Sequence, residues 1–227
     1  MAVTDRLPGW RRPLAVVAHP DDESFGLGAV LSAFEVAGAR PAVLCFTHGE
    51  ASTLHGVEGD LRTLRADELK EAARLLGIDA IDLRDEPDGA LAASRQDVLA
   101  AGVTEAVNRW GCDGLVAFDL GGVTGHPDHD AATRAAILAA EQLGLGVLGW
   151  CLPEKVADLL NDESGTSFSS RSDLEIDIVV DVDRERQLAA VQAHPSQAVP
   201  GSILWRRLDL LDDREHLRWL LPSTPTP

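Results

Sequence analysis

Short apolar runs alternate with longer amphipathic segments through the first two thirds of the chain. The apolar runs contain β-branched residues and predict buried strands at 14–18, 42–47, 80–83 and 114–119. The segments between them have helical periodicity and predict helices at 27–37, 60–76, 94–110 and 128–143. Strands that alternate with helices in this way predict an α/β fold with a Rossmann-like, doubly wound, mainly parallel sheet and helices on both faces.

The last third of the chain has a less regular pattern. We expect a strand at 146–151, a polar surface loop at 161–173, an alternating strand at 174–182 and a helix at 184–193. An apolar stripe over 203–221 predicts a last helix docked on the sheet. These elements together predict one domain over 1–221, followed by a disordered Pro- and Thr-rich tail at 222–227.

Composition and charge exclude several classes of partner. The chain has 37 acidic and 20 basic residues, a formal net charge of −17, which repels nucleic acid and anionic membrane surfaces. The first apolar run is too short for a signal peptide or a membrane span, so we expect a cytoplasmic protein. Cys45, Cys112 and Cys151 lack metal-type spacing and are expected to be buried free thiols in a reducing compartment.

Ionisable residues cluster directly after two of the predicted strands. The run His-Pro-Asp-Asp-Glu at 19–23 follows the first strand, and the run His-Pro-Asp-His at 126–129 follows the fourth through a glycine-rich linker. Active sites of open α/β sheets form outside the carboxyl ends of the strands. Both clusters are therefore expected at the same edge of the sheet, although any single His or Asp there is more often a turn or cap residue.

The residue types in these clusters suit a catalytic zinc ion. Zinc prefers a small set of nitrogen and oxygen ligands and keeps one position for water, and His19, Asp22 and His129 would supply that set. The same set also accepts other divalent transition metals such as iron, cobalt or manganese. Asp21 and His126 would then remain to accept a proton and to stabilise an oxyanion, as amide hydrolysis requires. The residues alone do not decide between Asp21 and Asp22 as the ligand.

The two clusters resemble the signature motifs of a known family. Ala-His-Pro-Asp-Asp-Glu at 18–23 and Gly-His-Pro-Asp-His at 125–129 are similar to those of the PIG-L/LmbE-type zinc de-N-acetylases. The resemblance implies one Zn²⁺ ion held by His19, Asp22 and His129, with Asp21 as general base, His126 stabilising the tetrahedral intermediate and Asp128 orienting a neighbouring imidazole.

Weaker similarities to the family suggest three substrate residues. Arg65 lies in an Arg-x-x-Glu-Leu segment, Asp88 in a Pro-Asp-Gly run and His194 in a His-Pro-Ser-Gln run. Each also has a purely structural interpretation, as a helix-surface ion pair, a turn and a helix cap respectively. The resemblance implies a tyrosine that assists catalysis in some family members, and this chain contains no tyrosine.

These observations favour one function over three alternatives. The leading hypothesis is zinc-dependent removal of an N-acetyl group from a small amide, an N-acetylglucosamine-type amino sugar or its conjugate. One alternative is an amidase of a thiol conjugate or other larger N-acyl compound, and another is a non-catalytic binding module. A metal-dependent phosphoesterase would place Lys or Arg beside the metal, and neither motif contains one.

Overall fold

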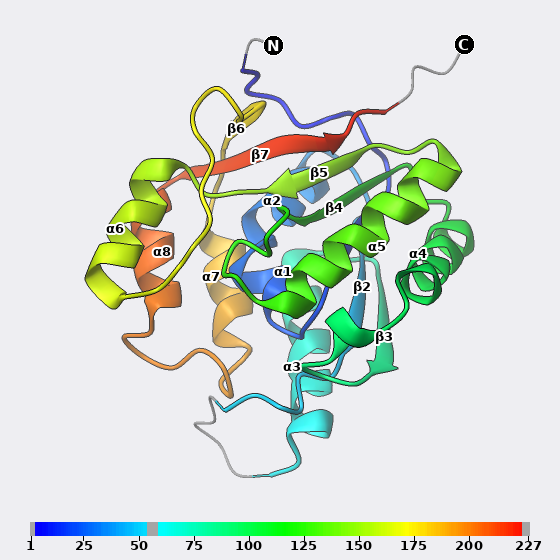
Figure 1. Ribbon diagram of the computed structural model, residues 1–227, viewed down its shortest axis with the longest axis horizontal. Helices are drawn as coiled ribbons and strands as arrows, with labels where there is room; N and C mark the ends of the chain where they lie inside the picture. The colour runs from blue at the N-terminus through cyan, green and yellow to red at the C-terminus, as the bar shows by residue number, and fades with distance from the viewer. Residues whose placement is uncertain (1–2, 54–58, 224–227) are drawn as a thin grey trace.

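A computed structural model describes residues 3–53 and 59–223 and contains a seven-stranded sheet (Figure 1). The strands are β1 (Pro13–Val17), β2 (Ala42–Thr47), β3 (Ala80–Glu86), β4 (Gly114–Phe118), β5 (Val147–Trp150), β6 (Ile178–Asp181) and β7 (Arg214–Leu221). Their order across the sheet is β3-β2-β1-β4-β5-β7-β6. The first five strands are parallel, and β7 pairs antiparallel with both β5 and β6. The predicted mainly parallel, doubly wound sheet is confirmed.

Helices cover both faces of the sheet. They are α1 (Asp22–Phe25), α2 (Gly28–Val36), α3 (Leu61–Leu76), α4 (Gln96–Trp110), α5 (Pro127–Leu143), α6 (Glu154–Ser164), α7 (Glu185–Gln192) and α8 (Ile203–Leu211), with a short 3-10 helix at Leu91–Ala93. Figure 1 shows α4 and α5 side by side, and both pack on one face. Helices α2, α3, α6 and α8 contribute to the core on the other face.

The central strands are buried on both sides because their side chains alternate between the two faces. Leu14 and Val16 join the core under α4 and α5, whereas Ala15 and Val17 join the opposite core. Helix boundaries follow local signals: the Asp60 side chain caps the start of α3, and Gly77 at φ 73° ends it.

Three predictions for the last third of the chain need correction. Residues 154–164 form α6, so only the later part of the predicted loop at 161–173 is irregular. The predicted strand at 174–182 is limited to β6. The predicted last helix at 203–221 is wrong beyond Leu211: the chain turns at Asp212 and returns as β7, where Glu215 and Leu217 are buried and the residues beside them are not, the two-residue period of a strand.

The described residues also bear on three further expectations. All three cysteines are buried and free, as predicted. No helix within 3–53 or 59–223 combines the length and apolarity needed to cross a bilayer. The domain boundary at 221 and the disordered tail stay predictions, since 224–227 lie outside the described residues.

The sheet order creates one switch point, between β1 and β4. From β1 the chain moves outward through β2 and β3, and it then returns to β4 on the other side of β1. Loops that leave the carboxyl ends of two such strands diverge and open a crevice between them. The two ionisable clusters of the sequence leave β1 and β4, so the fold brings both to this crevice.

Candidate active site

The loop after β1 fixes the orientation of Asp22. One carboxylate oxygen, Oδ2, accepts hydrogen bonds from the backbone N–H groups of Ala18 (3.2 Å) and His19 (2.9 Å). The other oxygen, Oδ1, lies 3.1 Å from His129 Nε2. Backbone donors thus hold the side chain and leave Oδ1 directed at the second cluster.

The start of α5 fixes the two histidines of the second cluster. His126 is the N-cap residue, with its Nδ1 accepting from the backbone N–H of Asp128 (3.2 Å), and Pro127 is the first helical residue. The Nδ1–H of His129 donates to the carbonyl oxygen of Gly122 (3.1 Å). A hydrogen bond at one ring nitrogen sets the tautomer, so Nε2 of His129 carries the free lone pair.

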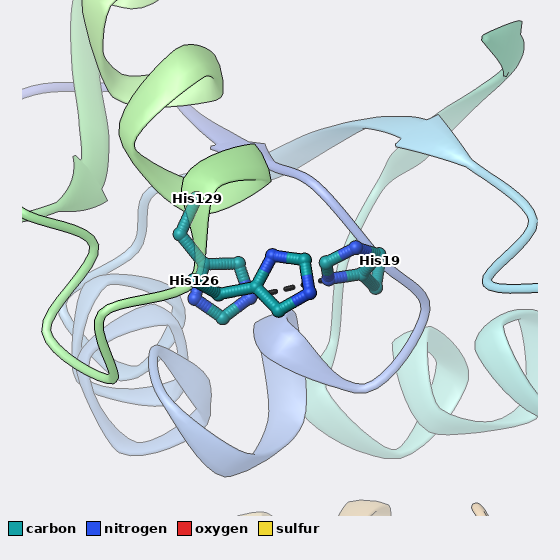
Figure 2. A group of neighbouring side chains, drawn as sticks. All are labelled: His19, His126 and His129. Atoms are coloured by element: carbon teal, nitrogen blue, oxygen red, sulfur yellow. Dashed lines mark hydrogen bonds between the residues drawn. The ribbon is translucent and has the colours of Figure 1, made fainter. Parts of the chain in front are cut away.

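A ring nitrogen of His19, a ring nitrogen of His129 and both carboxylate oxygens of Asp22 meet where the two clusters converge. His19 Nδ1 lies 3.1 Å from His129 Nε2 and 3.6 Å from Asp22 Oδ2, and Asp22 Oδ1 lies 3.1 Å from His129 Nε2. Figure 2 shows His19 facing the His126 and His129 rings across this point. His126 joins the two other histidines in a group whose ring nitrogens lie within 4.8 Å of one another. This His/Asp group can hold a metal ion.

Asp21 lies beside this group in a strained backbone conformation. Its φ of 119° is rare for a residue with a side chain, and its N–H donates to Glu23 Oε2 (2.9 Å). Its carboxylate Oδ2 lies 3.2 Å from Arg65 Nη2. Burial raises the pKa of Asp21 to about 6, against the opposing charge of Arg65.

Arg65 reaches the site from α3 and is 3 % exposed. Besides Asp21, its guanidinium donates to the carbonyl oxygens of Gly49 (2.7 Å) and Pro20. Gly49 has a φ of 65°, and a Cβ there would lie 2.1 Å from Arg65 Nη1. The surface ion pair that sequence alone also allowed is therefore wrong, because Arg65 is a buried partner of the predicted base.

Asp88 and Asp128 lie on the other side of His19. The Nε2–H of His19 donates to Asp88 Oδ1 (3.0 Å), and Asp128 Oδ2 lies 3.5 Å away. Burial alone would lower the pKa of His19, but hydrogen bonds to Asp128, Asp22 and Asp88 hold it well above its usual value. Asp128 is thus placed to orient His19, and it also accepts from the backbone N–H groups of Gly89 (2.8 Å) and Leu91 (3.0 Å).

His194 lies behind the site rather than on its surface. It has no exposed surface, and its Nε2 lies 2.8 Å from Glu23 Oε1 and 3.3 Å from Ser24 Oγ. Burial lowers and the Glu23 carboxylate raises the pKa of His194, with a net upward shift. The His194 side chain is inaccessible to a substrate in this structure, contrary to the predicted substrate contact. It instead contacts Glu23, whose carboxylate accepts from the Asp21 backbone N–H.

A cleft of about 380 Å³ opens at this site. Seven of the predicted residues line it, together with residues that the motifs did not reveal: Phe25, Gly26, Ala51, Ser52, Thr53, Gly89, Phe118, Thr124, Gln197, Leu204 and Arg207. Asp128 lies behind His19 and is fully buried. Two arginines, Arg65 and Arg207, reach the cleft from helices outside the motifs. The motif composition is therefore no argument against anion binding in this site.

The family comparison agrees with the two motifs. The model of the PIG-L family, described as GlcNAc-PI de-N-acetylase, matches residues 14–140. A relative from Kineococcus radiotolerans, named 1D-myo-inositol 2-acetamido-2-deoxy-alpha-D-glucopyranoside deacetylase, is 32% identical over 192 residues, which are 69% of this chain and 53% of the relative. The chain thus spans about half the length of the curated relatives it matches.

Solved structures show the same fold. An N,N'-diacetylchitobiose deacetylase from Pyrococcus horikoshii superposes with a TM-score of 0.68 at 23% identity, covering 95% of this chain and 87% of that one. A 4-carboxy-2-hydroxymuconate hydratase from Pseudomonas putida superposes with a TM-score of 0.70 at 16% identity, covering 96% and 99%. Since proteins with different reactions share this fold, the reaction has to be argued from the site.

The family assignment itself rests on the sequence match, because the model spans more than half of the chain and includes both ionisable clusters. The chain belongs to the PIG-L family, whose model is described as GlcNAc-PI de-N-acetylase.

Proposed function

We propose that this protein is a zinc-dependent hydrolase that removes an N-acetyl group from an N-acetylglucosamine-type amino sugar or its conjugate. The observation that carries the proposal is the convergence of His19, Asp22 and His129 at the switch point of the sheet, with Asp21 beside them. The names of the matched relatives support the substrate class.

The donor atoms fit a zinc ion. Ligands at zinc bond lengths in a tetrahedral site lie about 3.3 Å apart. His129 Nε2 lies 3.1 Å from both His19 Nδ1 and Asp22 Oδ1, and His19 Nδ1 lies 3.6 Å from the other Asp22 oxygen, Oδ2. His19 donates through Nε2 and His129 donates through Nδ1, so the two facing nitrogens, His19 Nδ1 and His129 Nε2, both carry lone pairs. A cation or a proton therefore has to lie between them. When bound, zinc supplies Lewis acidity that polarises an amide carbonyl and acidifies water.

Asp21 is placed to act as the general base. Arg65 and the backbone contact to Glu23 fix its carboxylate at the edge of the ligand group. A carboxylate held there accepts a proton from the attacking water and delivers it to the amine that leaves. Asp21 therefore moves the proton, while Asp22 holds the metal.

His126 is placed to stabilise the developing oxyanion. Its Nδ1 accepts from the Asp128 backbone, so its proton is on Nε2 and is available for donation. Burial and the charges of His19 and His129 lower the pKa of His126. A neutral imidazole that donates one hydrogen bond stabilises negative charge on the carbonyl oxygen without a full counter-charge.

The rest of the cleft binds the sugar. Asp88 and Thr53 line it with polar atoms beside the ligand group, as hydroxyl recognition requires. Arg65 is placed to contact substrate through its position in the lining, besides its role at Asp21. The proposal includes the cytoplasm as the location, supported by the three buried free cysteines.

The test is amine release from N-acetylglucosamine, its inositol conjugate and its short oligomers, with zinc-loaded and chelator-stripped protein in parallel. We expect one of these sugars to release amine only with the metal, and Asp21→Asn serves as the inactive control. Turnover limited to larger N-acyl conjugates would replace the substrate class by the amidase alternative. Turnover limited to a phosphate ester such as p-nitrophenyl phosphate would overturn the reaction class.

A further inference from the structure

Arg207 contributes a buried positive charge to the reaction cleft. It lies on α8, far in sequence from both motifs, and is 2 % exposed although it lines the cleft. Burial lowers the pKa of Arg207 to about 10, so the side chain still carries its charge at neutral pH. A buried charge is costly unless it has a partner, which makes its surroundings informative.

The contacts of Arg207 fix its position but do not neutralise it. Nη2 donates to the carbonyl oxygen of Phe25 (2.6 Å), and the guanidinium carbon lies 4.9 Å from the centre of the Trp150 ring. Nε is buried without a hydrogen-bond partner. Within residues 3–53 and 59–223, no carboxylate oxygen lies within 4.0 Å of a guanidinium nitrogen of Arg207, the limit for an ion pair.

Neighbouring charges are already engaged elsewhere. Glu215, Asp22 and Asp21 attract Arg207 from a distance. The Glu215 carboxylate is bound by Arg184 Nη1 (2.5 Å) and Trp150 Nε1 (2.6 Å), Asp22 by two backbone N–H groups and His129, and Asp21 by Arg65. The other arginine of the cleft, Arg65, is engaged by Asp21 and two carbonyl oxygens. Both arginines have a buried Nε without a hydrogen-bond partner, but among the described residues Arg207 is the lining arginine without an ion pair.

We propose that Arg207 recognises an anionic group, a carboxylate or a phosphate, carried by the N-acylated substrate. A guanidinium held by stacking and one hydrogen bond presents its remaining donors with little loss of entropy on binding, and its fork matches both groups. Phe25 and Leu204 give that part of the cleft an apolar lining, which strengthens the charge interaction. This inference rests on the proposed function, because it selects among substrates of that reaction.

The test compares three substrates on zinc-loaded protein. N-acetylglucosamine is neutral, N-acetylglucosamine 1-phosphate carries its anion on the amine side, and N-succinylglucosamine carries it on the acyl side. We expect Arg207→Gln to raise KM for one of the two anionic substrates by roughly 10- to 100-fold, the loss of a charge-assisted hydrogen bond, and to change KM for the neutral sugar less than about threefold. The substrate that responds identifies the side on which the anion is recognised.

Arg206→Gln is the matched control. Arg206 is the preceding residue on α8, is exposed and pairs with Glu163 (2.8 Å), so its loss should change no KM value. Arg207→Lys keeps the charge without the fork and should give an intermediate KM, which keeps the test decisive if Arg207→Gln does not fold. An equal change for neutral and anionic substrates, or no change for either anion, would overturn the inference.

Binding of product analogues separates this inference from the proposed function. Titration calorimetry with glucosamine 1-phosphate and succinate measures affinity without turnover. An affinity that depends on Arg207 in a protein without deacetylase activity would overturn the function and leave the anion site standing. Deacetylation of the neutral sugar, together with affinities for both anions that do not depend on Arg207, would overturn the anion site and leave the proposed function standing.

Discussion

Replacing Asp128 tests whether its carboxylate holds the loop after β3 against the metal-binding group. Asp128 is fully buried at the start of α5, and its two carboxylate oxygens accept from the backbone N–H groups of Gly89 and Leu91. Asp88, the residue before Gly89, contacts His19. Asp128 therefore joins the loop after β3 to the metal-binding group, and Asp128→Ala should weaken both the fold and the cleft wall.

The expected loss follows from the two hydrogen bonds. The Leu91 N–H is buried and costs about 1–3 kcal/mol when left without an acceptor, whereas Gly89 is exposed and its N–H can bind water instead. Asp128→Ala should therefore lower the free energy of unfolding by about 1–3 kcal/mol. Asp128→Asn retains one acceptor oxygen but turns an NH₂ group toward the other N–H. With its oxygen on the buried Leu91 N–H, it should cost less than Asp128→Ala, about 1 kcal/mol or below.

Urea unfolding of chelator-stripped protein measures these values without a contribution from metal binding. Asp67→Ala is the matched control, because Asp67 is exposed and, within the part of the chain that the structure describes, pairs only with Lys70 on the surface of α3, where an ion pair contributes at most about 1 kcal/mol. A loss for Asp128→Ala no larger than that of the control would refute the reasoning. The loop would then be held by other contacts.

Three further substitutions test the site and the fold. Asp21→Asn should lower kcat by about 10²- to 10⁴-fold while zinc content, measured by atomic absorption, stays at the wild-type level, whereas His129→Ala should lose both; loss of zinc in the first variant would contradict the division between base and ligand. Gly49→Ala should destabilise the protein by at least ~1 kcal/mol and lower kcat at constant zinc content, because its Cβ would displace Arg65; unchanged kcat would mean that Arg65 does not position the base. Gly102→Ala should raise the free energy of unfolding by ~0.5–1 kcal/mol, since Gly102 lies within α4 with open space at its Cβ, and a loss of stability would contradict the helix assignment.

Much of the sheet could be predicted because its elements are locally coded. Buried strands such as Leu14 to Ala18 are continuous apolar runs, and Gly77 marks a helix end by a φ that other residues rarely adopt. The tail beyond Leu211 was mispredicted because an apolar stripe fits a helix and a strand alike. The Asp212-Asp213 pair and the alternation of apolar Leu217 and Trp219 with polar His216 and Arg218 are signals for the turn and the strand.

The candidate site likewise has features that the sequence predicts and features that only the tertiary structure reveals. The sequence by itself determined that His19, Asp22 and His129 follow strands whose carboxyl ends share an edge, because strand order along the chain and the motifs are local information. Only the tertiary structure decided that Asp22 rather than Asp21 faces His129, that His194 lies behind the site, and that Arg207 enters the cleft. Those outcomes depend on backbone direction after β1 and on the packing of α8 over the sheet, and long-range packing leaves no periodic trace in the sequence.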